Sequence, residues 1–444
     1  MPEPRYKQVV DRLAAEIRGG RLPPGTRLPT HRALAAREGV ALVTATRIYA
    51  ELCAMGLASG ETGRGTYVRD TSLPHGHGID QPAVPAGVVD LNFNYPAVPG
   101  QADMLRAALR TLAASGDLEP LLRYQPHGGR AHERAIVARH VARRGLAIPA
   151  EQVLLVDGAQ HGLAVTAMAL LQPGDVVACD ALTYPGFKVL AGAQRLELVA
   201  LPAAGEGPDP DALTALCKRR RVRALYTMPT LHNPLGWVMG TRCRKALVAV
   251  ARRHGLVVVE DAAYAFLAAD APPPLASLAP ECTVYVSGFS KSVATGLRVG
   301  FLAAPAEWVP GIERAIRATT WNTPALMTAI ACGWIADGTV ARLEAAKRRD
   351  ATARQAVAAD VLARFERIAH PASYFTWLPL PDEARADAVA AVLLRQGISV
   401  STAEPFSAAR RAPHALRLAL GSVALDALRP ALEEVARVAE AHAF

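Results

Sequence analysis

The chain has 444 residues, of which half are hydrophobic and a fifth charged, and it carries a net charge of +9. This composition is typical of a globular protein of two to four domains and excludes a disordered or low-complexity one. The six cysteines show no CxxC spacing, which argues against a zinc site and against a disulfide framework. This spacing leads us to expect no bound metal. Because the N-terminus lacks an apolar signal core, we expect a soluble, cytoplasmic protein with no membrane segment.

The first 70 residues predict a small domain of helices followed by a hairpin. Tyr6, Val10, Leu13 and Ile17 recur at helical spacing, so the first segment is predicted to be an amphipathic helix ending near Gly19. Further helices are predicted over 31–38, with Thr30 as N-cap, and over about 42–55, where Ala45, Ile48 and Leu52 share one face. Residues 57–68 alternate around glycines and predict a hairpin with a basic tip.

This order of elements favours a DNA-binding head. One helix can enter the major groove while the hairpin tip reaches phosphates or the minor groove. Residues 1–70 contain eleven Lys and Arg against seven Asp and Glu, a modest basic excess. The alternative is a small helical domain that binds another protein.

The head resembles the winged helix-turn-helix domain of GntR-type bacterial regulators over essentially its whole length. The resemblance implies DNA binding, for which Arg32, Thr44, Arg47 and Arg64 are the best candidates. One departure is Ala41-Leu42, where such heads usually begin the recognition helix with Ser-Arg; the change removes a polar cap and a cation near the bases. The resemblance rests on Gly19, Arg21-Leu22, Pro24-Gly25, Leu28-Pro29, Arg32, Leu34-Ala35, Gly39-Val40, Thr44, Arg47, Tyr49, Leu52, Gly56-Leu57 and Gly63 to Thr66.

Residues 71–88 are predicted to form a flexible linker, because three prolines and three glycines lie among 18 residues. Fully extended, it would reach about 60 Å, far enough to place the head over another subunit. His75 and His77 lie in it without a further ligand nearby, so we predict a tether and no metal site.

After Val89, short apolar runs alternate with helical stretches, which predicts an α/β fold with a mainly parallel sheet and helices on both faces. Ligands on such sheets bind at the carboxyl ends of the strands. The predicted strands are 153–156, 176–179, 223–226, 256–260 and 283–287.

The last of these strands leads into Ser290-Lys291 and, seven residues after the lysine, Arg298. A lysine amine can form a Schiff base with pyridoxal 5′-phosphate (PLP), while a hydroxyl and an arginine hold its phosphate. The chain has only six lysines, so few side chains could take this role. Taken alone, the motif is equally compatible with a solvated lysine on a loop.

The other strand ends each suit a different edge of the same ring. Gly158-Ala159-Gln160 opens a helix and can cradle a phosphate. Tyr184 can stack on a planar heterocycle, and Asn233, held between Pro and Gly residues, can donate to a phenolate oxygen. Asp261 ends an apolar strand, where a protonated pyridine nitrogen would offset its burial, and Tyr264 can reach the ring oxygen.

Two further segments fit this site. Tyr124 precedes a predicted helix and is a candidate phosphate ligand, within its own chain or across a dimer interface. Arg417 alternates with three leucines and so lies on the opposite face of a strand, where it can grip a carboxylate through two hydrogen bonds. The alternative for Arg417 is an arginine at a surface edge.

Residues 89–444 resemble the fold-type I, class I aminotransferases over their whole length, with a large domain at about 150–320 and a small domain formed by the remaining C-terminal part. The resemblance makes Lys291 the Schiff-base lysine and Arg417 the ligand of a substrate α-carboxylate. Gly288 departs from it, because the family usually has Ser or Thr three residues before the lysine; Ser287 is a possible substitute. The remaining cofactor contacts implied are Asp261, Asn233, Tyr264, Tyr184, Gly158, Ala159, Gln160, Ser290, Arg298 and Tyr124.

A winged head joined to such a body resembles the MocR subgroup of GntR regulators. The resemblance implies a homodimeric, DNA-binding transcriptional regulator that senses PLP, or an amine or amino acid that reacts with PLP. The alternative is a working PLP-dependent aminotransferase that carries a DNA-binding head, since the residues needed for turnover are all present.

Overall fold

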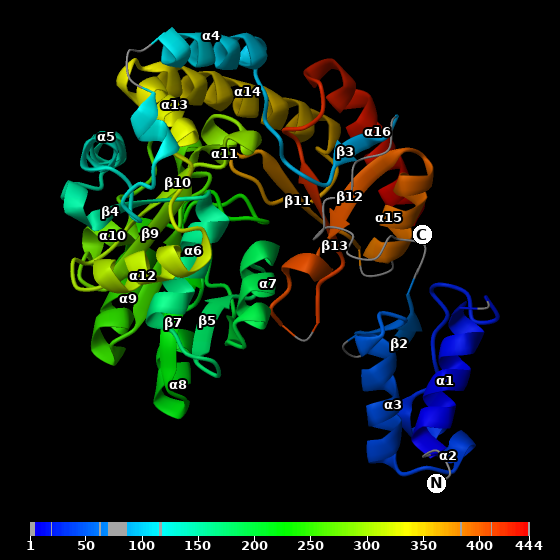
Figure 1. Cartoon of the computed structure of the whole chain (residues 1–444). Coiled ribbons are helices and arrows are strands. Elements are labelled where there is room, and N and C mark those ends of the chain that lie inside the picture. The colour runs from blue at the N-terminus through cyan, green and yellow to red at the C-terminus, as the bar shows by residue number, and fades with distance from the viewer. Residues whose placement is uncertain are drawn as a thin grey trace.

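The computed structural model describes residues 5–18, 20–61, 64–69, 87–114, 118–381, 384–409 and 411–442. The chain forms a small N-terminal head and a larger body (Figure 1). Most of the predicted linker, including His75 and His77, lies outside the described residues.

The head consists of three helices and a two-stranded antiparallel hairpin. The side chains of Val10, Leu34, Ile48 and Leu52 form its core and are at most 2% exposed. Thr30 caps α2, its hydroxyl accepting from the Ala33 N–H at 3.2 Å, as predicted. The elements are α1 (Arg5–Arg18), α2 (His31–Glu38), α3 (Leu42–Ala54), β1 (Ala58–Glu61) and β2 (Gly65–Val68).

The larger part of the body is built on a seven-stranded sheet with the strand order β4-β10-β9-β8-β7-β5-β6. The sheet is mainly parallel, as predicted; β10 runs antiparallel to both of its neighbours. Its strands are β4 (Val153–Val156), β5 (Val176–Asp180), β6 (Glu197–Leu201), β7 (Val222–Thr227), β8 (Val257–Asp261), β9 (Thr283–Gly288) and β10 (Gly300–Ala303).

Helices cover both faces of this sheet, because alternate strand residues are apolar on each side. Val177 and Val259 pack toward α6, α7 and α12, whereas Ala178 and Val258 pack toward α8, α9 and α10. The helices are α5 (Ala131–Ala142), α6 (Ala159–Leu170), α7 (Pro185–Ala193), α8 (Pro210–Arg219), α9 (Thr241–His254), α10 (Leu275–Leu278), α11 (Phe289–Ser292), α12 (Val309–Thr319) and α13 (Ala325–Ala336).

A second sheet, of order β11-β13-β12-β3, forms the smaller part of the body. Its edge strand β3 comes from the segment that follows the linker and pairs in parallel with β12. Helix α14 extends from the large sheet to this smaller one (Figure 1). The elements are β3 (Val89–Leu91), α4 (Gln101–Ala114), α14 (Thr339–Val361), β11 (Phe375–Pro379), α15 (Ala386–Arg395), β12 (Ile398–Thr402), the short 3-10 helix η5 (Glu404–Phe406), β13 (Ala415–Ala419) and α16 (Leu425–Ala441).

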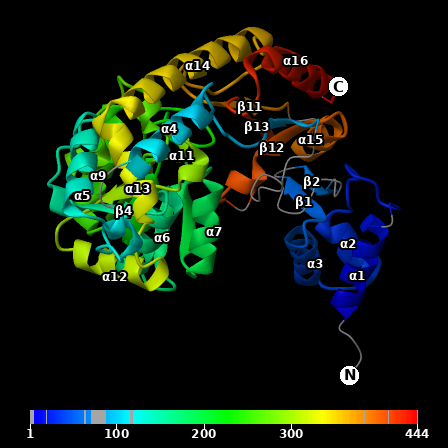
Figure 2. The ribbon, with the colours of Figure 1, turned by 45° about the horizontal axis from the view of Figure 1, so that its top comes forward.

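The hairpin of the head lies beside the smaller sheet (Figure 2). Arg385, just before α15, donates to the Ser59 hydroxyl at 2.9 Å, and its guanidinium lies 5.3 Å from the Tyr67 ring. Arg69, just after β2, donates to the carboxylate of Glu404 at 2.7 Å. Within the described part of the chain, no helix is both long and apolar enough to cross a membrane.

Candidate functional site

Lys291 lies in the short helix α11, directly after β9. Its Nζ donates to the main-chain carbonyl of Asn94 at 2.7 Å. Burial, followed by the charges of Arg417 and Arg298, lowers the pKa of Lys291 from 10.5 to about 8. A neutral amine is the nucleophile that an aldehyde requires, and this shift makes it far more abundant near neutral pH than in an exposed lysine.

Asp261 is the last residue of β8 and is 2% exposed. The Tyr226 hydroxyl donates to its Oδ2 at 2.9 Å and the Ala263 N–H to its Oδ1 at 3.1 Å. Burial nevertheless raises the pKa of Asp261 from 3.8 to about 6, because these two donors compensate it only partly. A cation placed beside this carboxylate would lower its pKa again.

The predicted phosphate-binding residues meet where β4 leads into α6. Gly158 has a φ of 84°, and a Cβ there would lie 2.8 Å from Nη2 of Arg298. The same Nη2 donates to the Asp157 carbonyl at 3.0 Å, which holds the guanidinium over the start of α6. Ala159 and Gln160 form the first turn of that helix, whose free N–H groups and dipole favour an anion.

The departure at Gly288 falls where β9 and β10 pack closely. A Cβ at this position would lie 3.2 Å from the Cα of Gly300 and from the Val299 carbonyl. A serine would therefore fit only if these neighbours moved by a few tenths of an ångström. The Ser287 hydroxyl does not replace it, because it donates to the Ala262 carbonyl at 3.1 Å.

Tyr184 and Tyr264 pack in the same core, with Tyr226 and Phe375. Tyr184 immediately precedes α7, and its ring covers Gly186 so closely that a Cβ there would clash with it. The Tyr264 ring centroid lies 6.0 Å from the Lys291 amine. Asn233, 6% exposed, lies in the turn after β7.

Arg417 lies on β13 and faces away from its leucine neighbours, as predicted. Leu416 and Leu418 belong to the core of the smaller sheet, whereas the Arg417 guanidinium lies 5.1 Å from the Phe375 ring and 4.9 Å from the Phe406 ring. The residue is 4% exposed, and burial lowers its pKa to about 10. It is therefore not an arginine at a surface edge.

Tyr124 is not brought to this site within the chain. The residue is 82% exposed, and its ring lies 5.4 Å from that of Trp321. A contact with the phosphate of a second subunit stays a prediction.

Several buried polar atoms at the site have no hydrogen-bond partner within the part of the chain that the structure describes. Leaving such atoms unpaired is costly, so they mark positions where a ligand can bind. The aminotransferase fold typically binds PLP. The Ser290 hydroxyl and the Arg417 Nε–H are donors that fit a phosphate and a carboxylate, whereas the Gln160 and Asn233 oxygens are acceptors, so Asn233 could donate to a phenolate oxygen only through its Nδ2. The atoms are Oε1 of Gln160, Oδ1 of Asn233, Oγ of Ser290 and Nε of Arg417.

Sequence reasoning missed two contributors. Tyr226, whose ring stacks on Phe187 at 3.7 Å, supports Asp261; its position on the strand beside β8 was a usable signal. The Asn94 carbonyl accepts a hydrogen bond from the Lys291 amine. No local sequence pattern indicated this contact, because the two residues are 197 positions apart.

In the head, the candidate DNA contacts lie on two helices and the hairpin. Arg32 and Arg47 are exposed and Thr44 and Arg64 are half-buried. The Arg47 guanidinium lies 4.1 Å from the Tyr6 ring, donates to its hydroxyl at 2.9 Å and approaches Glu51 at 3.5 Å. Arg47 thus reaches DNA only by exchanging these contacts.

The predicted loss of the cap at Ala41 is confirmed, since α3 begins there without a side-chain hydrogen bond. We expect Ala41→Ser to stabilise the first turn of α3 by about 1 kcal/mol, measured as roughly fivefold slower amide hydrogen exchange in the full chain. Thr30→Ala is the matched control and should accelerate exchange in α2 by a similar factor. Unchanged exchange at α3 in Ala41→Ser would refute this expectation.

Comparison with known proteins agrees with this division of the chain. The family described as bacterial regulatory proteins, gntR family, matches residues 5–68. The family described as aminotransferase class I and II matches residues 86–435.

Relatives with both parts are also found. The HTH-type transcriptional regulator TauR of Rhodobacter capsulatus is 29% identical, over 95% of this chain and 93% of its own. The probable rhizopine catabolism regulatory protein MocR of Rhizobium meliloti is 26% identical, over 76% of this chain and 72% of its own.

Among solved structures, the α-aminoadipate aminotransferase LysN of Thermus thermophilus, complexed with N-(5′-phosphopyridoxyl)-L-leucine, superimposes with a TM-score of 0.72. It is 27% identical, and the match covers 81% of this chain and 93% of its own. The chain therefore belongs to the class I and II aminotransferase family and, with its gntR-family head, is an HTH-type transcriptional regulator of the MocR type.

Proposed function

We propose that the body binds PLP at Lys291 and that the protein regulates transcription in response to PLP, or to an amine or amino acid that reacts with PLP. The observation that carries this proposal is the buried Lys291 amine with its lowered pKa, on which the charges of Arg417 and Arg298 act. A buried carboxylate at the end of the neighbouring strand β8 and four buried polar atoms of the candidate residues without partners in the described part of the chain support it, since a bound ligand would pair them.

Each side chain has a defined task in this proposal. Lys291 would attach the aldehyde through its neutral amine, and Asp261 would keep the pyridine nitrogen protonated. Arg298, Ser290 and the start of α6 would hold the phosphate. When bound, the cofactor supplies an electron sink for bonds at the carbon that bears the substrate amine.

Arg417 would hold the carboxylate of an amino-acid effector. Its Nη2 donates to the Asn92 carbonyl and, at 3.1 Å, to the Ser401 hydroxyl, which leaves Nε without a partner in the described structure. The low polarity of the two flanking phenylalanine rings strengthens a charged hydrogen bond formed there.

A short path leads from this arginine to the head. The Phe406 ring that packs on Arg417 belongs to η5, which begins with Glu404, the partner of Arg69. An effector at Arg417 could therefore change how the head is held, provided that it binds the two arrangements with different affinity.

We further propose a head-to-tail homodimer, in which Tyr124 reaches the phosphate of the other subunit. Its support is the exposure of large apolar side chains near Tyr124: Leu122 is 87% exposed and Trp321 is 39% exposed. Such clustered exposure is typical of an interface.

The proposal is tested by measuring binding to the DNA upstream of the protein's own gene, with and without PLP and with a panel of amino acids. We expect affinity to fall steeply with salt, and at least one of these ligands to change it. Arg32→Ala should weaken binding and flatten the salt slope by about one phosphate contact. Salt-independent binding, or affinity that no ligand changes, would contradict the proposal.

A working aminotransferase remains the second candidate, because the same side chains supply what proton transfer and carbanion stabilisation require. In that case Lys291, once released, would carry the proton between the substrate carbon and the cofactor. Measurement of amino-group transfer with a panel of amino acids and keto acids distinguishes the candidates, since sustained turnover is expected only of an enzyme.

A further inference from the structure

A second lysine, Lys347, directs its amine at the turn that carries Lys291. The side chain of Lys347, on α14, has no exposed surface, and its Nζ donates to the carbonyls of Lys291 at 2.9 Å and Val293 at 2.7 Å. No carboxylate in the described part of the chain forms an ion pair with it, although a buried ammonium normally requires one. Because a buried ammonium without an ion pair is costly, we expect Lys347 to have a role beyond stability.

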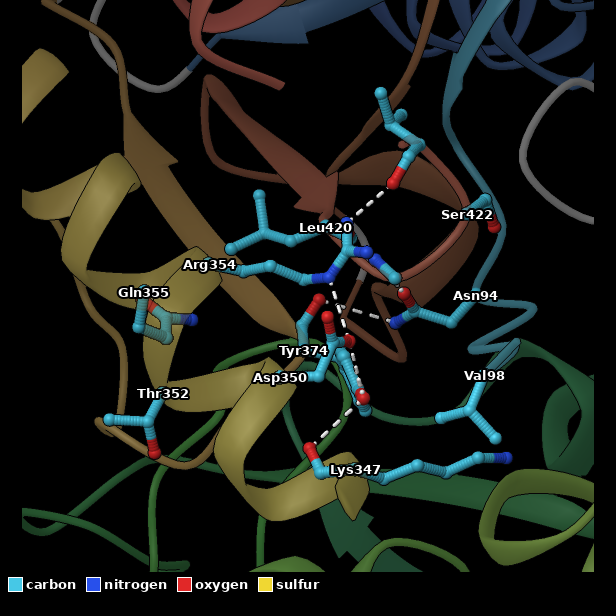
Figure 3. Close-up of polar contacts among 12 residues, drawn as sticks. Asn94, Val98, Lys347, Asp350, Thr352, Arg354, Gln355, Tyr374, Leu420 and Ser422 are labelled. Carbon is cyan, nitrogen blue, oxygen red and sulfur yellow. Dashed lines mark hydrogen bonds and ion pairs between the residues drawn. The ribbon is translucent and has the colours of Figure 1, made fainter. Parts of the chain in front are cut away.

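Lys347 and Lys291 belong to one closed ring of hydrogen bonds. The Lys291 amine donates to the Asn94 carbonyl, and the Asn94 amide donates to the Tyr374 carbonyl at 3.3 Å. The Tyr374 hydroxyl donates to the Lys347 carbonyl at 3.0 Å, and Lys347 closes the ring at the Lys291 carbonyl. Figure 3 shows the part of this ring formed by Asn94, Tyr374 and Lys347.

The ring is anchored to the smaller sheet. The Tyr374 hydroxyl also lies 2.8 Å from Oδ2 of Asp350, which pairs with Arg354 at 2.8 Å (Figure 3). Arg354 in turn donates to the Leu420 carbonyl at 2.6 Å. The main chain around Lys291, which follows the large sheet, is thereby fixed to the smaller sheet through α14.

We propose that Lys347 is a positioning residue for Lys291: its amine, bonded to two carbonyls of the turn that carries Lys291, fixes that turn and so holds the Lys291 amine in place. This inference rests on the proposed capture of PLP at Lys291.

Burial and then the charge of Lys291 lower the pKa of Lys347 from 10.5 to about 8. The pKa of Lys291 is lowered by burial, Arg417 and Arg298, so Lys347 acts on Lys291 through its hydrogen bonds to the turn. The charged and titratable groups that face the two amines from the surrounding elements are Asp350, Glu344, Arg417, Arg298, Tyr95, Tyr264 and Tyr374.

The test is the rate of PLP capture by the full-length chain, followed by visible absorbance across a pH series. In the wild type the rate should rise with a midpoint near pH 8, where Lys291 loses its proton. Lys347→Met, nearly isosteric and without donors, should slow the plateau rate about tenfold, because nothing then fixes the turn, and should leave the midpoint unchanged. Lys347→Gln keeps two N–H donors, so it should restore most of the plateau rate.

Lys188→Met is the matched control, because Lys188 is half-buried and, like Lys347, donates to two main-chain carbonyls, those of Glu404 and Pro405. It should change neither midpoint nor plateau. If Lys347→Met fails to fold, Lys347→Arg replaces it, since its bulkier head group cannot take the place of the amine between the two carbonyls, and it should slow the plateau rate likewise.

An unchanged plateau rate in Lys347→Met, even with lowered thermal stability, would show a merely structural role and overturn the inference, and so would a plateau rate in Lys347→Gln as slow as that of Lys347→Met. A wild-type chain that captures no PLP would overturn the proposed function, and the inference with it. The two failures are thus distinguished by the wild-type measurement.

Discussion

Lys291→Ala is expected to abolish the retention of PLP through gel filtration, and with it the visible absorbance of the purified protein. The reason is that covalent attachment needs an amine at this point of the site, 2.7 Å from the Asn94 carbonyl and in the same buried region as Arg417. Lys347 cannot replace it, since its amine is held by the carbonyls of Lys291 and Val293.

The matched control is Lys218→Ala, an exposed lysine on α8, which should retain the full absorbance. Noncovalent PLP should still bind to the alanine variant weakly, through the phosphate-binding residues. A Lys291→Ala protein that stays yellow after gel filtration would refute the assignment.

Asp261→Asn is expected to weaken PLP binding by about 10- to 150-fold, the equivalent of a charge-assisted hydrogen bond worth roughly 1.5–3 kcal/mol. Asparagine has a single amide oxygen, which can keep the hydrogen bond from the Ala263 N–H, while its Nδ2 would face the Tyr226 hydroxyl, which can rotate to accept from it. The loss then comes chiefly from the missing charge opposite the pyridine nitrogen. Titration of the apoprotein with PLP measures the effect.

The stability of the apoprotein provides the control, because it should change in the opposite direction. The folded pKa of Asp261 is raised from 3.8 to about 6, so the unfolded chain releases this proton first. The buried carboxylate therefore destabilises the wild type progressively as the pH rises from about 4 through 6, by up to roughly 3 kcal/mol above pH 6. The asparagine variant should unfold at a higher temperature than the wild type at pH 8 and at a similar one at pH 4; reduced stability at pH 8 would indicate a structural role instead.

Local patterns predicted the elements of the head and of the large sheet well. Helix α2 and strand β4 have the predicted bounds, and Ala45, Ile48 and Leu52 form the buried face of α3. These predictions were correct because helical spacing and short apolar runs reflect burial on one or both faces of an element, and both patterns can be read from the sequence.

The positions of Asp261 and Arg417 were also predictable, for related reasons. Asp261 ends an apolar strand, so its carboxylate is expected at the carboxyl edge of the sheet. Arg417 alternates with leucines, so its side chain is expected on the face of the strand opposite to theirs. The strand topology then brings both toward Lys291.

What the sequence did not indicate depends on contacts between distant segments. Strand β3 has only three residues, and its pairing with β12 spans the whole body. Likewise, Lys347 looks like an ordinary helical lysine in the sequence, and its hydrogen bonds to the turn after β9 become visible only in the structure. The close packing of β10 against Gly288 was not visible in the sequence either.

The central claim, that side chains from separate loops converge on one PLP at Lys291, is tested most directly by chemical trapping. The protein is incubated with PLP, reduced with borohydride and digested, and the modified peptide is identified by mass spectrometry. We predict a phosphopyridoxyl group on Lys291, in about one copy per chain. Stable modification of a different lysine, or of none, would contradict the account.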